Sequence, residues 1–432
     1  MSEQVFRFRD YTPRPLEIID TTLREGQQTS LLHDHYKYFF DTQDKIEITR
    51  ALITYGVKFM ELFAPIVSPR EKEDFQAIKE TRDGLITQKG YTFLLAHVRT
   101  HPADVEAAIQ AGFDGLNFYI GTSEQSRRYN HGKDLDEIVR RASDLIEDVR
   151  RNHPDLILRF SGEDAFRTPW EDLTRVYDVV APHVDRFGTP DTVGVATPQA
   201  VRERVMALRE RYPNVALEGH FHEDRGFALC NSLEAVRSGM QYINTTILGI
   251  GERSGITSMT ALLFNLYLEK EYDMLEGYTL RASYPINVML ADKLHSLVPS
   301  REPVSLTNRT HTAGVHQKAV LNDSSTYEAL PLDMFGVVES EILLGPLSGW
   351  NVIHYFLKEI KGFRLDEQTA RRIAKVFKER VYSMGEGVSP ADLLMEIAEK
   401  EFRLERIQVP EGFQGRVLQM MDRRSAPRRE VR

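Results

Sequence analysis

The feature that most constrains this chain is a regular alternation of strand-like and helix-like segments over roughly its first 250 residues. Strands that alternate with helices form parallel sheets, and eight such units are the number found in a (β/α)8 barrel. The strand-like runs are Leu16–Asp20, Phe59–Phe63, Tyr91–His97, Gly115–Gly121, Leu156–Ser161, Val184–Gly188, Val215–His220 and Tyr242–Leu248. The helix-like stretches between them include Gln43–Tyr55, Pro102–Ala111, Asp134–Asn152, Pro198–Arg211 and Ser232–Ser238.

A doubly wound open sheet is the competing α/β architecture. It is expected to carry a glycine-rich phosphate turn after its first strand. Here the segment from Thr21 to Gly26 reads Thr-Thr-Leu-Arg-Glu-Gly, which does not match GxGxxG. The sequence therefore favours an α/β protein with a TIM barrel.

The pattern changes beyond about residue 280. Ile286–Leu297 has the spacing of an amphipathic helix, residues 300–350 are polar and loop-rich, and 366–382 and 389–403 again predict helices. We therefore expect a mainly helical C-terminal region. The predicted divisions are an N-terminal arm (1–15), the barrel (16–278), a linker or lid with a helical subdomain (279–405) and a basic, flexible tail (406–432).

Two short motifs stand where a barrel would place its active site, after the first and seventh strands. One contains Arg24 and Glu25, and the other reads Gly-His-Phe-His-Glu-Asp and contains His220 and His222. Residues i and i+2 of a strand share a face, so both imidazoles can aim at one point. Two histidines and one carboxylate, with positions left open, form a ligand set for a catalytic divalent metal. A His-x-His alone is as often a chance surface feature as a metal site. Because both motifs follow predicted strands, we favour a metal site.

Other chemically capable residues also fall at predicted strand ends. Because active sites of these barrels lie at the carboxyl ends of the strands, this clustering indicates an enzyme. The residues are His97 after the third run, Arg159, Ser161 and Glu163 at the fifth, Thr192 after the sixth, and the Gly249–Gly255 segment after the eighth.

Composition narrows the class of protein further. The chain has 432 residues, of which 41% are hydrophobic and 28% charged, which is typical of globular proteins. A net charge of −9 gives no reason to expect binding to nucleic acid or to anionic membranes. No apolar run is long enough to span a bilayer, and the first residues have no signal-peptide core. The single cysteine, Cys230, fits a reducing cytoplasm, where we expect the protein.

Taken together, the motifs resemble those of the Claisen-condensing branch of the metal-dependent "DRE" TIM barrels. This branch contains homocitrate, isopropylmalate and citramalate synthases and the Re-type citrate synthases. The resemblance runs from about residue 16 to residue 360. Besides the two metal motifs it includes RFSGED (159–164), DTVGVATP (191–198), TTILGIGERSGIT (245–257) and HTAGVH (311–316).

The resemblance implies an acyltransferase that joins acetyl-CoA to a small α-keto acid. The enolate of acetyl-CoA attacks the keto group, and thioester hydrolysis then releases CoA. One divalent ion (Mg²⁺, Mn²⁺ or Zn²⁺) on Glu25, His220 and His222 would polarise the keto group. Arg24 would stabilise the developing alkoxide.

The resemblance also implies roles for residues elsewhere in the chain. The candidates for removing the methyl proton of acetyl-CoA are Glu163, His316 and Tyr327. Thr192 would hold the C1 carboxylate of the keto acid. The loop with Gly249, Gly251, Arg253 and Gly255 would lie near CoA, where backbone N–H groups can bind phosphate. A plain tight turn is the alternative for this loop, and an ordinary loop histidine is the alternative for His316.

The choice of keto acid depends on Arg159. Homocitrate synthases have Arg before the Phe-Ser of the strand-5 motif, whereas isopropylmalate synthases typically have an acidic residue there. A buried Arg159 beside Ser161 and His97 suits a second carboxylate, and it would be a costly unpaired charge beside an isopropyl group. The favoured substrate is therefore 2-oxoglutarate, followed by oxaloacetate. An isopropylmalate- or citramalate-type synthase is a further alternative.

Several positions depart from the pattern of the family. Glu223 replaces the usual Asn after the second histidine, Gln27 replaces a Glu, and Asn117 stands where homocitrate synthases usually have Asp. An extra stretch, Leu31–Phe40, follows the first strand. Its two histidines could indicate a second metal, but a lid or an interface loop fits them better.

Two other classes of protein are alternatives to a Claisen-condensing enzyme. An acyl-CoA lyase of the same superfamily is disfavoured by the GERSG loop and the AGVH segment. A catalytically dead barrel that serves as a binding module is disfavoured because the metal motifs are intact. The resemblance further implies amino-acid biosynthesis, such as that of lysine. It also implies a homodimer in which the segment around His316 reaches the barrel of a second copy.

Overall fold

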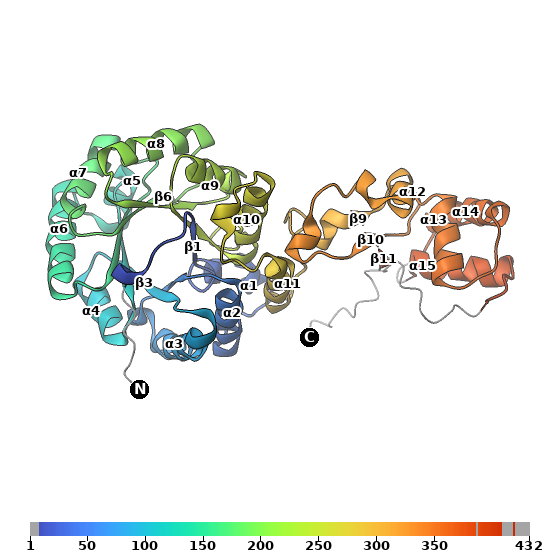
Figure 1. Cartoon of the computed structure of the whole chain (residues 1–432), viewed down its shortest axis with the longest axis horizontal. Helices are drawn as coiled ribbons and strands as arrows, with labels where there is room; N and C mark the ends of the chain where they lie inside the picture. The colour runs from blue at the N-terminus through green and yellow to red at the C-terminus, as the bar shows by residue number, and fades with distance from the viewer. Residues whose placement is uncertain (1–7, 386–387, 408–417, 420–432) are drawn as a thin grey trace. The chain divides into compact units, whose positions relative to one another are not determined.

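A closed barrel of eight parallel strands forms the first of two compact units in the computed structural model, which describes residues 8–385, 388–407 and 418–419. The strands follow one another around the barrel in chain order (Figure 1). Their bounds are β1 Glu17–Asp20, β2 Phe59–Phe63, β3 Phe93–Arg99, β4 Gly115–Gly121, β5 Ile157–Glu163, β6 Arg186–Asp191, β7 Ala216–Phe221 and β8 Tyr242–Thr245. The predicted (β/α)8 barrel is confirmed, and every predicted strand overlaps an observed one.

A ring of helices surrounds the strands, as Figure 1 shows. The long ones are α2 Thr42–Tyr55, α3 Pro69–Lys89, α4 Pro102–Ala111, α6 Leu135–Asn152, α7 Trp170–Val180, α8 Pro198–Arg211, α9 Ala228–Arg237, α10 Met259–Leu268 and α11 Ser283–Lys293, and the short ones are α1 Ser30–Asp34 and α5 Glu124–Ser126.

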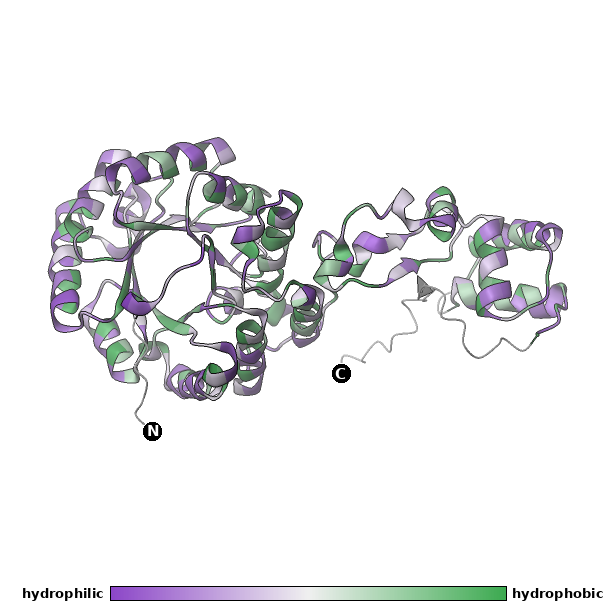
Figure 2. Cartoon of the chain, viewed as in Figure 1, coloured by the Kyte–Doolittle hydropathy of each residue, from purple (hydrophilic) through white to green (hydrophobic). Residues whose placement is uncertain are grey.

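Local sequence explains where these helices begin, end and pack. In α2, the Asp41 side chain accepts from the Asp44 backbone N–H while Asp44 bonds back to Asp41, and the helix ends at Gly56 with φ 110°. In α6, Ile138, Ala142 and Ile146 lie four residues apart and are fully buried. Hydrophobic and hydrophilic residues are correspondingly interleaved along the outer helices (Figure 2).

Aromatic residues close the amino end of the barrel. Phe59, Phe93 and Tyr242 are the first residues of β2, β3 and β8, and they belong to one buried cluster. Phe8 and Tyr11, from the described part of the N-terminal arm, pack edge-on against Phe59 and Phe93, with ring centres 5.4 to 6.2 Å apart. We call this cluster the barrel floor.

The second compact unit begins at Val304. Its elements are β9 Thr310–His311, α12 Gly314–Asn322, β10 Ser340–Ile342, α13 Trp350–Tyr355 with a π-helical continuation Phe356–Ile360, α14 Glu367–Val381, α15 Pro390–Glu396 with a π-helical continuation Ile397–Glu401, and β11 Leu418–Gln419. The three strands form a parallel sheet in the order β11-β10-β9. The last helices enclose their own core around Phe356, Phe377 and Leu394.

One domain boundary and one helix differ from the sequence-based predictions. The first unit extends to Pro303 rather than to residue 278, because α11 packs on α2 and α10 of the barrel. The segment from 314 to 322, predicted to be part of a loop-rich stretch, is the helix α12. Of the predicted basic tail (406–432), most lies outside the described residues.

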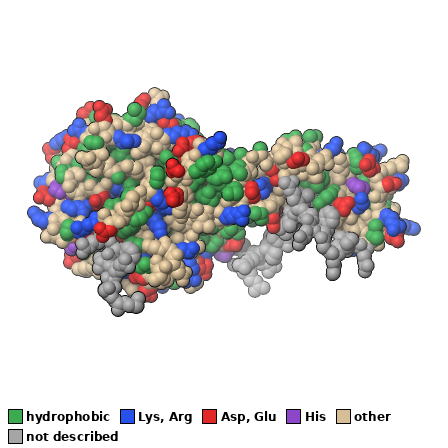
Figure 3. Space-filling view, in the orientation of Figure 1, with side chains coloured by type: hydrophobic (Ala, Val, Ile, Leu, Met, Phe, Trp, Pro, Cys, Tyr) green, Lys and Arg blue, Asp and Glu red, His purple; other side chains and the backbone are tan. Residues whose placement is uncertain are grey.

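The visible surface carries acidic and basic side chains interspersed, without a field of one sign (Figure 3). Within the described residues, no helix has the length and apolar character needed to cross a membrane.

Candidate active site

A cavity of about 740 Å³ opens at the carboxyl ends of the barrel strands. This is the end at which enzymes with this fold carry their active sites. The sequence-predicted residues that line it are Arg24, Glu25, His97, Arg159, Ser161, Glu163, Thr192, His220, His222 and Arg253. The barrel therefore brings together residues that lie up to 229 positions apart in the chain (24 to 253).

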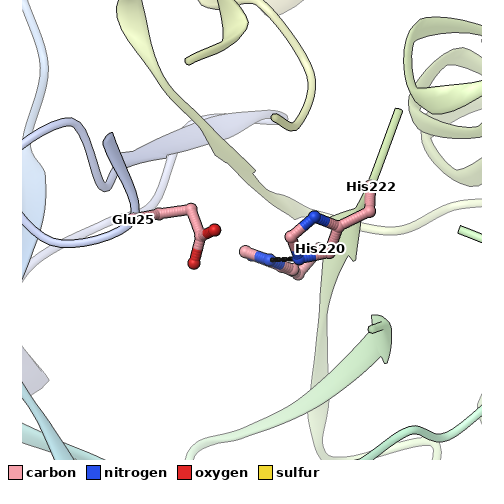
Figure 4. Close-up of side chains that lie close together, drawn as sticks. All are labelled: Glu25, His220 and His222. Carbon is pink, nitrogen blue, oxygen red and sulfur yellow. Dashed lines mark hydrogen bonds between the residues drawn. The ribbon is translucent and has the colours of Figure 1, made fainter. Parts of the chain in front are cut away.

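Glu25, His220 and His222 meet at one side of this cavity. One ligand atom from each lies within 4.8 Å of the other two. Figure 4 shows the carboxylate after β1 pointing toward two imidazole rings, one from β7 and one from the residue that follows it, whose Nε2 atoms lie 3.2 Å apart. Among the described residues this is the only such group of three or more potential ligands.

The protonation states of the three side chains suit a metal. Burial, followed by the proximity of His222, lowers the pKa of His220 to about 3, and burial also lowers the pKa of His222. Burial opposes ionisation of Glu25, but Arg24 and the two histidines outweigh it and lower its pKa to about 2. Two neutral imidazoles and a carboxylate are the forms that ligate metals. Donors of these types that converge at one point fit a divalent ion.

Arg24 is held between two carboxylates. Its Nη1 donates to Glu25 Oε2 at 2.5 Å, and its Nε and Nη2 donate to Glu61 Oε1 at 2.9 and 2.6 Å. Glu61 lies at the centre of β2 and is fully buried. Arg24, His97 and Arg159 outweigh the burial of Glu61 and hold its pKa well below the usual range. The Arg24 guanidinium is thus fixed beside the candidate metal ligands, where it can stabilise negative charge.

Arg159 is paired in the same way. Its Nη2 donates to Glu61 Oε2 at 3.0 Å, its Nε to Glu218 Oε1 at 2.9 Å, and its Nη1 to Ser161 Oγ at 2.8 Å. From the sequence we expected Arg159 to be an unpaired charge unless a substrate carboxylate met it. In the structure, Glu61 and Glu218 already pair with Arg159.

Six fully or nearly fully buried charges form one alternating chain through the barrel. Successive members are joined by ion pairs in the order Glu25, Arg24, Glu61, Arg159, Glu218 and Arg186. Three carboxylates and three guanidinium groups sum to zero. Such a chain is favourable only because every buried charge has an oppositely charged neighbour.

His97, Glu163 and Thr192 line other parts of the cavity. Burial, followed by the nearby Arg24, lowers the pKa of His97 to about 4, and its ring stacks on Tyr119 at 4.2 Å. Burial, followed by Asp164, raises the pKa of Glu163. Thr192 Oγ1 accepts from the Asp164 backbone N–H at 2.9 Å, which leaves its own hydroxyl proton free to donate.

The loop after β8 closes over Glu25. A Cβ on Gly251 would meet Glu25 Cγ at 3.1 Å, and the backbone N–H of Glu252 donates to Glu25 Oε1 at 3.0 Å. Gly249 and Gly255 have φ of 67° and 82°, which favours glycine. Arg253 also has a positive φ, and it pairs with Asp224 at 2.7 Å. The loop is therefore more than a plain turn, because it fixes Glu25, a candidate metal ligand.

The departures from the family pattern have structural consequences. Glu223 Oε2 accepts from the Ala228 backbone N–H at 2.7 Å, so it bonds the first turn of α9. Gln27 donates to the Leu23 carbonyl. Asn117 Nδ2 donates to Glu61 Oε2 at 2.5 Å, where an aspartate would place a second buried carboxylate.

The inserted stretch after β1 forms the short helix α1 and a loop. His33 and His35 belong to no group of potential metal ligands within the described residues, and their rings instead lie edge-on to Tyr38 and His295. Tyr36, Tyr38 and Phe39 are exposed, whereas Phe40 is fully buried.

His316 and Tyr327 lie in the second unit. Their rings stack at 3.9 Å, and both side chains are exposed. His316 stands on α12 and is therefore a helical residue, not a loop histidine. His311, close by in sequence, bonds Glu328 at 3.1 Å.

Sequence reasoning missed Glu61, Glu218 and Asn244. Each is buried, and each bonds a predicted site residue. A signal was present, since Glu61 is a single acid within the apolar run Phe-Met-Glu-Leu-Phe of β2. Glu218 precedes His220 by two positions and so shares its face of β7.

Comparison with known sequences agrees with this geometry. The profile of the HMGL-like family matches residues 15–286, and the homocitrate synthase post-HMGL domain-like profile matches residues 304–383. The two matches fall on the two compact units, so the first unit defines an HMGL-like α/β barrel.

Full-length relatives narrow the assignment. The chain is 36% identical over 372 residues to the mitochondrial homocitrate synthase of Schizosaccharomyces pombe, covering 85% of each chain. It is 29% identical to 2-isopropylmalate synthase 1 of Caldanaerobacter subterraneus, covering 92% of this chain and 96% of the relative. The chain belongs to the homocitrate synthase and isopropylmalate synthase family of HMGL-like proteins.

Solved structures support the fold. The HMG-CoA lyase of Bacillus subtilis superposes with a TM-score of 0.55 at 22% identity, covering 67% of this chain and 98% of the lyase. At this identity the likeness establishes the barrel and carries no argument about the reaction.

Proposed function

We propose that this protein is a homocitrate synthase, which condenses acetyl-CoA with 2-oxoglutarate and releases homocitrate and CoA. The observation that carries the proposal is the cavity in which the Glu25–His220–His222 triad, Arg24 and Arg159 meet. The 36% identity to homocitrate synthases over both units supports the same reaction. The match of residues 304–383 to a homocitrate synthase domain favours it over a lyase of the superfamily.

The charges of the site favour a dicarboxylic keto acid. The buried chain of three carboxylates and three guanidinium groups is neutral by itself. A divalent metal would add two positive charges, so the site attracts an anionic substrate. A second carboxylate could bond Arg159 and Ser161, which an isopropyl group could not, so 2-oxoglutarate or oxaloacetate fits better than the keto acid of an isopropylmalate synthase.

A metal bound to the triad would act as a Lewis acid on the keto oxygen. Arg24, clamped by Glu25 and Glu61, offers a fixed positive charge for the oxyanion that forms. Ser161 and Arg159 would bind the far carboxylate, and the Thr192 hydroxyl would donate to the near one.

Glu163 is our candidate within the barrel for the base that takes the methyl proton of acetyl-CoA. Its raised pKa makes its carboxylate a stronger base than an ordinary glutamate. The loop from Gly249 to Gly255 would lie along the thioester arm of CoA, with Arg253 at its edge.

The test is a thiol-release assay with acetyl-CoA and a panel of keto acids. We expect the highest kcat/KM with 2-oxoglutarate. A preference for oxaloacetate would make the protein a citrate synthase, and a preference for 2-oxoisovalerate or pyruvate would overturn the charge argument. Cleavage of a hydroxyacyl-CoA thioester, with no condensation of acetyl-CoA and any keto acid, would indicate a lyase.

We further propose a homodimer in which His316 and Tyr327 complete the active site of a second copy. Their stacked, exposed rings support this, because both side chains are accessible to a second copy. Mixing His316→Ala chains with His220→Ala chains tests it. If His316 acts in trans, heterodimers regain about one good site in two; no recovery after proven exchange would mean that it acts within its own chain or not at all.

The cellular setting belongs to the same proposal. A reducing cytoplasm and a place in amino-acid biosynthesis, such as that of lysine, stay predictions, and the free Cys230 is compatible with the former. Fractionation of cells that express a tagged chain would test the location.

A further inference from the structure

One of the two histidines at the metal site has a protein partner on its outer nitrogen, and the other has none among the described residues. His220 Nδ1 lies 3.1 Å from Asn244 Oδ1, whereas His222 Nδ1 is buried without a partner. Asn244 is fully buried, belongs to β8 and lines the cavity. The two ligands are therefore held differently.

The amide of Asn244 can face His220 in only one sense. Its Nδ2 donates to Glu218 Oε1 at 3.0 Å. Glu218 is paired with Arg159 at 2.8 Å and with Arg186 at 3.0 Å, and a carboxylate between two guanidinium groups offers acceptors only. The NH₂ of Asn244 must therefore face Glu218, and its carbonyl oxygen must face His220.

A carbonyl oxygen accepts a hydrogen bond and cannot donate one. His220 Nδ1 must therefore carry the proton, which leaves the lone pair of the neutral ring on Nε2. His220 Nε2 is the atom that lies 3.2 Å from His222 Nε2 at the triad. In metalloenzymes, partners of this kind fix the tautomer and orientation of a histidine ligand.

We propose that Asn244, oriented by Glu218, is a positioning residue that sets the Nδ1–H tautomer of His220 and presents its Nε2 to the divalent metal. The proposal rests on the metal site of the proposed function but not on the identity of the keto acid. It also joins two parts of the site, because Glu218 Oε1 accepts from both Asn244 and Arg159.

The first experiment needs no variant. Long-range ¹H–¹⁵N spectra of the metal-free, ¹⁵N-histidine-labelled full chain report which ring nitrogen carries the proton. We expect His220, assigned by its loss in His220→Ala, to be a single Nδ1–H tautomer. His222, whose Nε2 faces the His220 lone pair at 3.2 Å, is expected to carry its proton on Nε2 in the metal-free chain. A His220 ring protonated on Nε2 would overturn the proposal.

The second experiment measures Mn²⁺ binding to the metal-free chain by calorimetry, without acetyl-CoA or keto acid. Asn244→Ala should weaken binding by about 10- to 100-fold, the usual effect of losing such a partner. Asn244→Asp keeps an acceptor for His220 but sets a carboxylate beside Glu218, so it should recover part of the affinity. Asn231→Ala, which removes an equally buried amide from α9, is the matched control and should bind Mn²⁺ as the wild type does.

Equal affinity of wild type and Asn244→Ala would overturn the proposal, and so would an Asn231→Ala loss as large as that of Asn244→Ala. If Asn244→Ala does not fold, the tautomer of the wild-type His220 measured in the first experiment decides whether the proposal stands. A chain that meets both expectations but condenses no keto acid would refute the proposed reaction and leave this inference standing.

Discussion

The two ends of the barrel are built from the same eight strands but differ in chemistry, since the carboxyl end is charged and the amino end is aromatic. The carboxyl end holds the triad of Glu25, His220 and His222, from which a chain of six buried charges runs through the barrel. The amino end holds the aromatic barrel floor, in which Phe8 and Tyr11 of the arm pack on Phe59 and Phe93. Arg186 marks the junction: its Nε donates to Glu218, while its guanidinium lies 4.8 Å from the centre of the Tyr242 ring.

The comparison teaches where stability and chemistry reside. Apolar burial at the floor stabilises the fold without any need for precise partners. Buried charges are favourable only when every one is paired, so they give position and not net stability. Substitutions at the two ends should therefore separate activity from folding.

The largest effect should follow loss of both histidine ligands. His220→Ala/His222→Ala should bind no divalent metal and lose about 10³-fold or more in kcat/KM, because Lewis-acid assistance disappears. Its resistance to urea should match that of metal-free wild type, since the floor is untouched. Metal analysis of the purified protein checks this, and full occupancy in the double variant would refute the metal site.

At the opposite end, Phe93→Ala should destabilise the fold by about 3–5 kcal/mol. Phe93 is 3% exposed and contacts both Phe8 and Tyr11, so its removal leaves a cavity in the floor. Below its melting temperature the variant should keep its metal affinity. Phe39→Ala, at a 56% exposed ring, is the control and should change stability by less than about 0.5 kcal/mol. A fall in metal affinity with unchanged stability would show that the floor serves the metal site and not the stability of the fold.

The third prediction concerns the role of Arg159 in selecting the keto acid. Arg159→Ala should raise the KM for the dicarboxylic keto acid by an amount worth about 2–5 kcal/mol. Pyruvate should be affected far less. Because the change also frees Glu61 and Glu218, only the ratio of the two effects is diagnostic. Arg99→Ala, at a 62% exposed arginine of the same cavity paired with Asp104, is the control. Equal losses for both substrates would remove Arg159 from selection.

Sequence alone predicted the parts of this molecule that depend on local pattern. The alternation of runs gave the barrel, and the spacing of His220 and His222 gave their shared face. The sequence could not predict which carboxylates pair with Arg159. The contacts to Glu61 and Glu218 depend on how β2, β5 and β7 are staggered around the closed barrel. The helix α12 was missed because Ala313, its N-cap, provides no side-chain cap.

The smallest predicted effect concerns a carboxyl group at the charged end that has no cation beside it among the described residues. Asp20, the last residue of β1, is 1% exposed and accepts hydrogen bonds from the Thr22 backbone N–H and hydroxyl at 2.9 and 3.0 Å. Burial outweighs these bonds and raises the pKa of Asp20 to about 7. Glu61, equally buried but paired with two arginines, shows the opposite shift.

The sign of the pH effect follows from the raised pKa. Between about pH 4 and pH 7 the native state keeps a proton on Asp20 that the unfolded chain has released, so its contribution to stability falls as pH rises through this window. Asp20→Asn should remove that slope and gain on the order of 1–3 kcal/mol relative to wild type between pH 5 and pH 8. Urea unfolding of the metal-free chains at four pH values measures it, with the exposed Asp34→Asn as control. If wild type and Asp20→Asn lose stability in parallel, Asp20 is ionised in the native state, and charge at this end of the barrel does not require a paired cation.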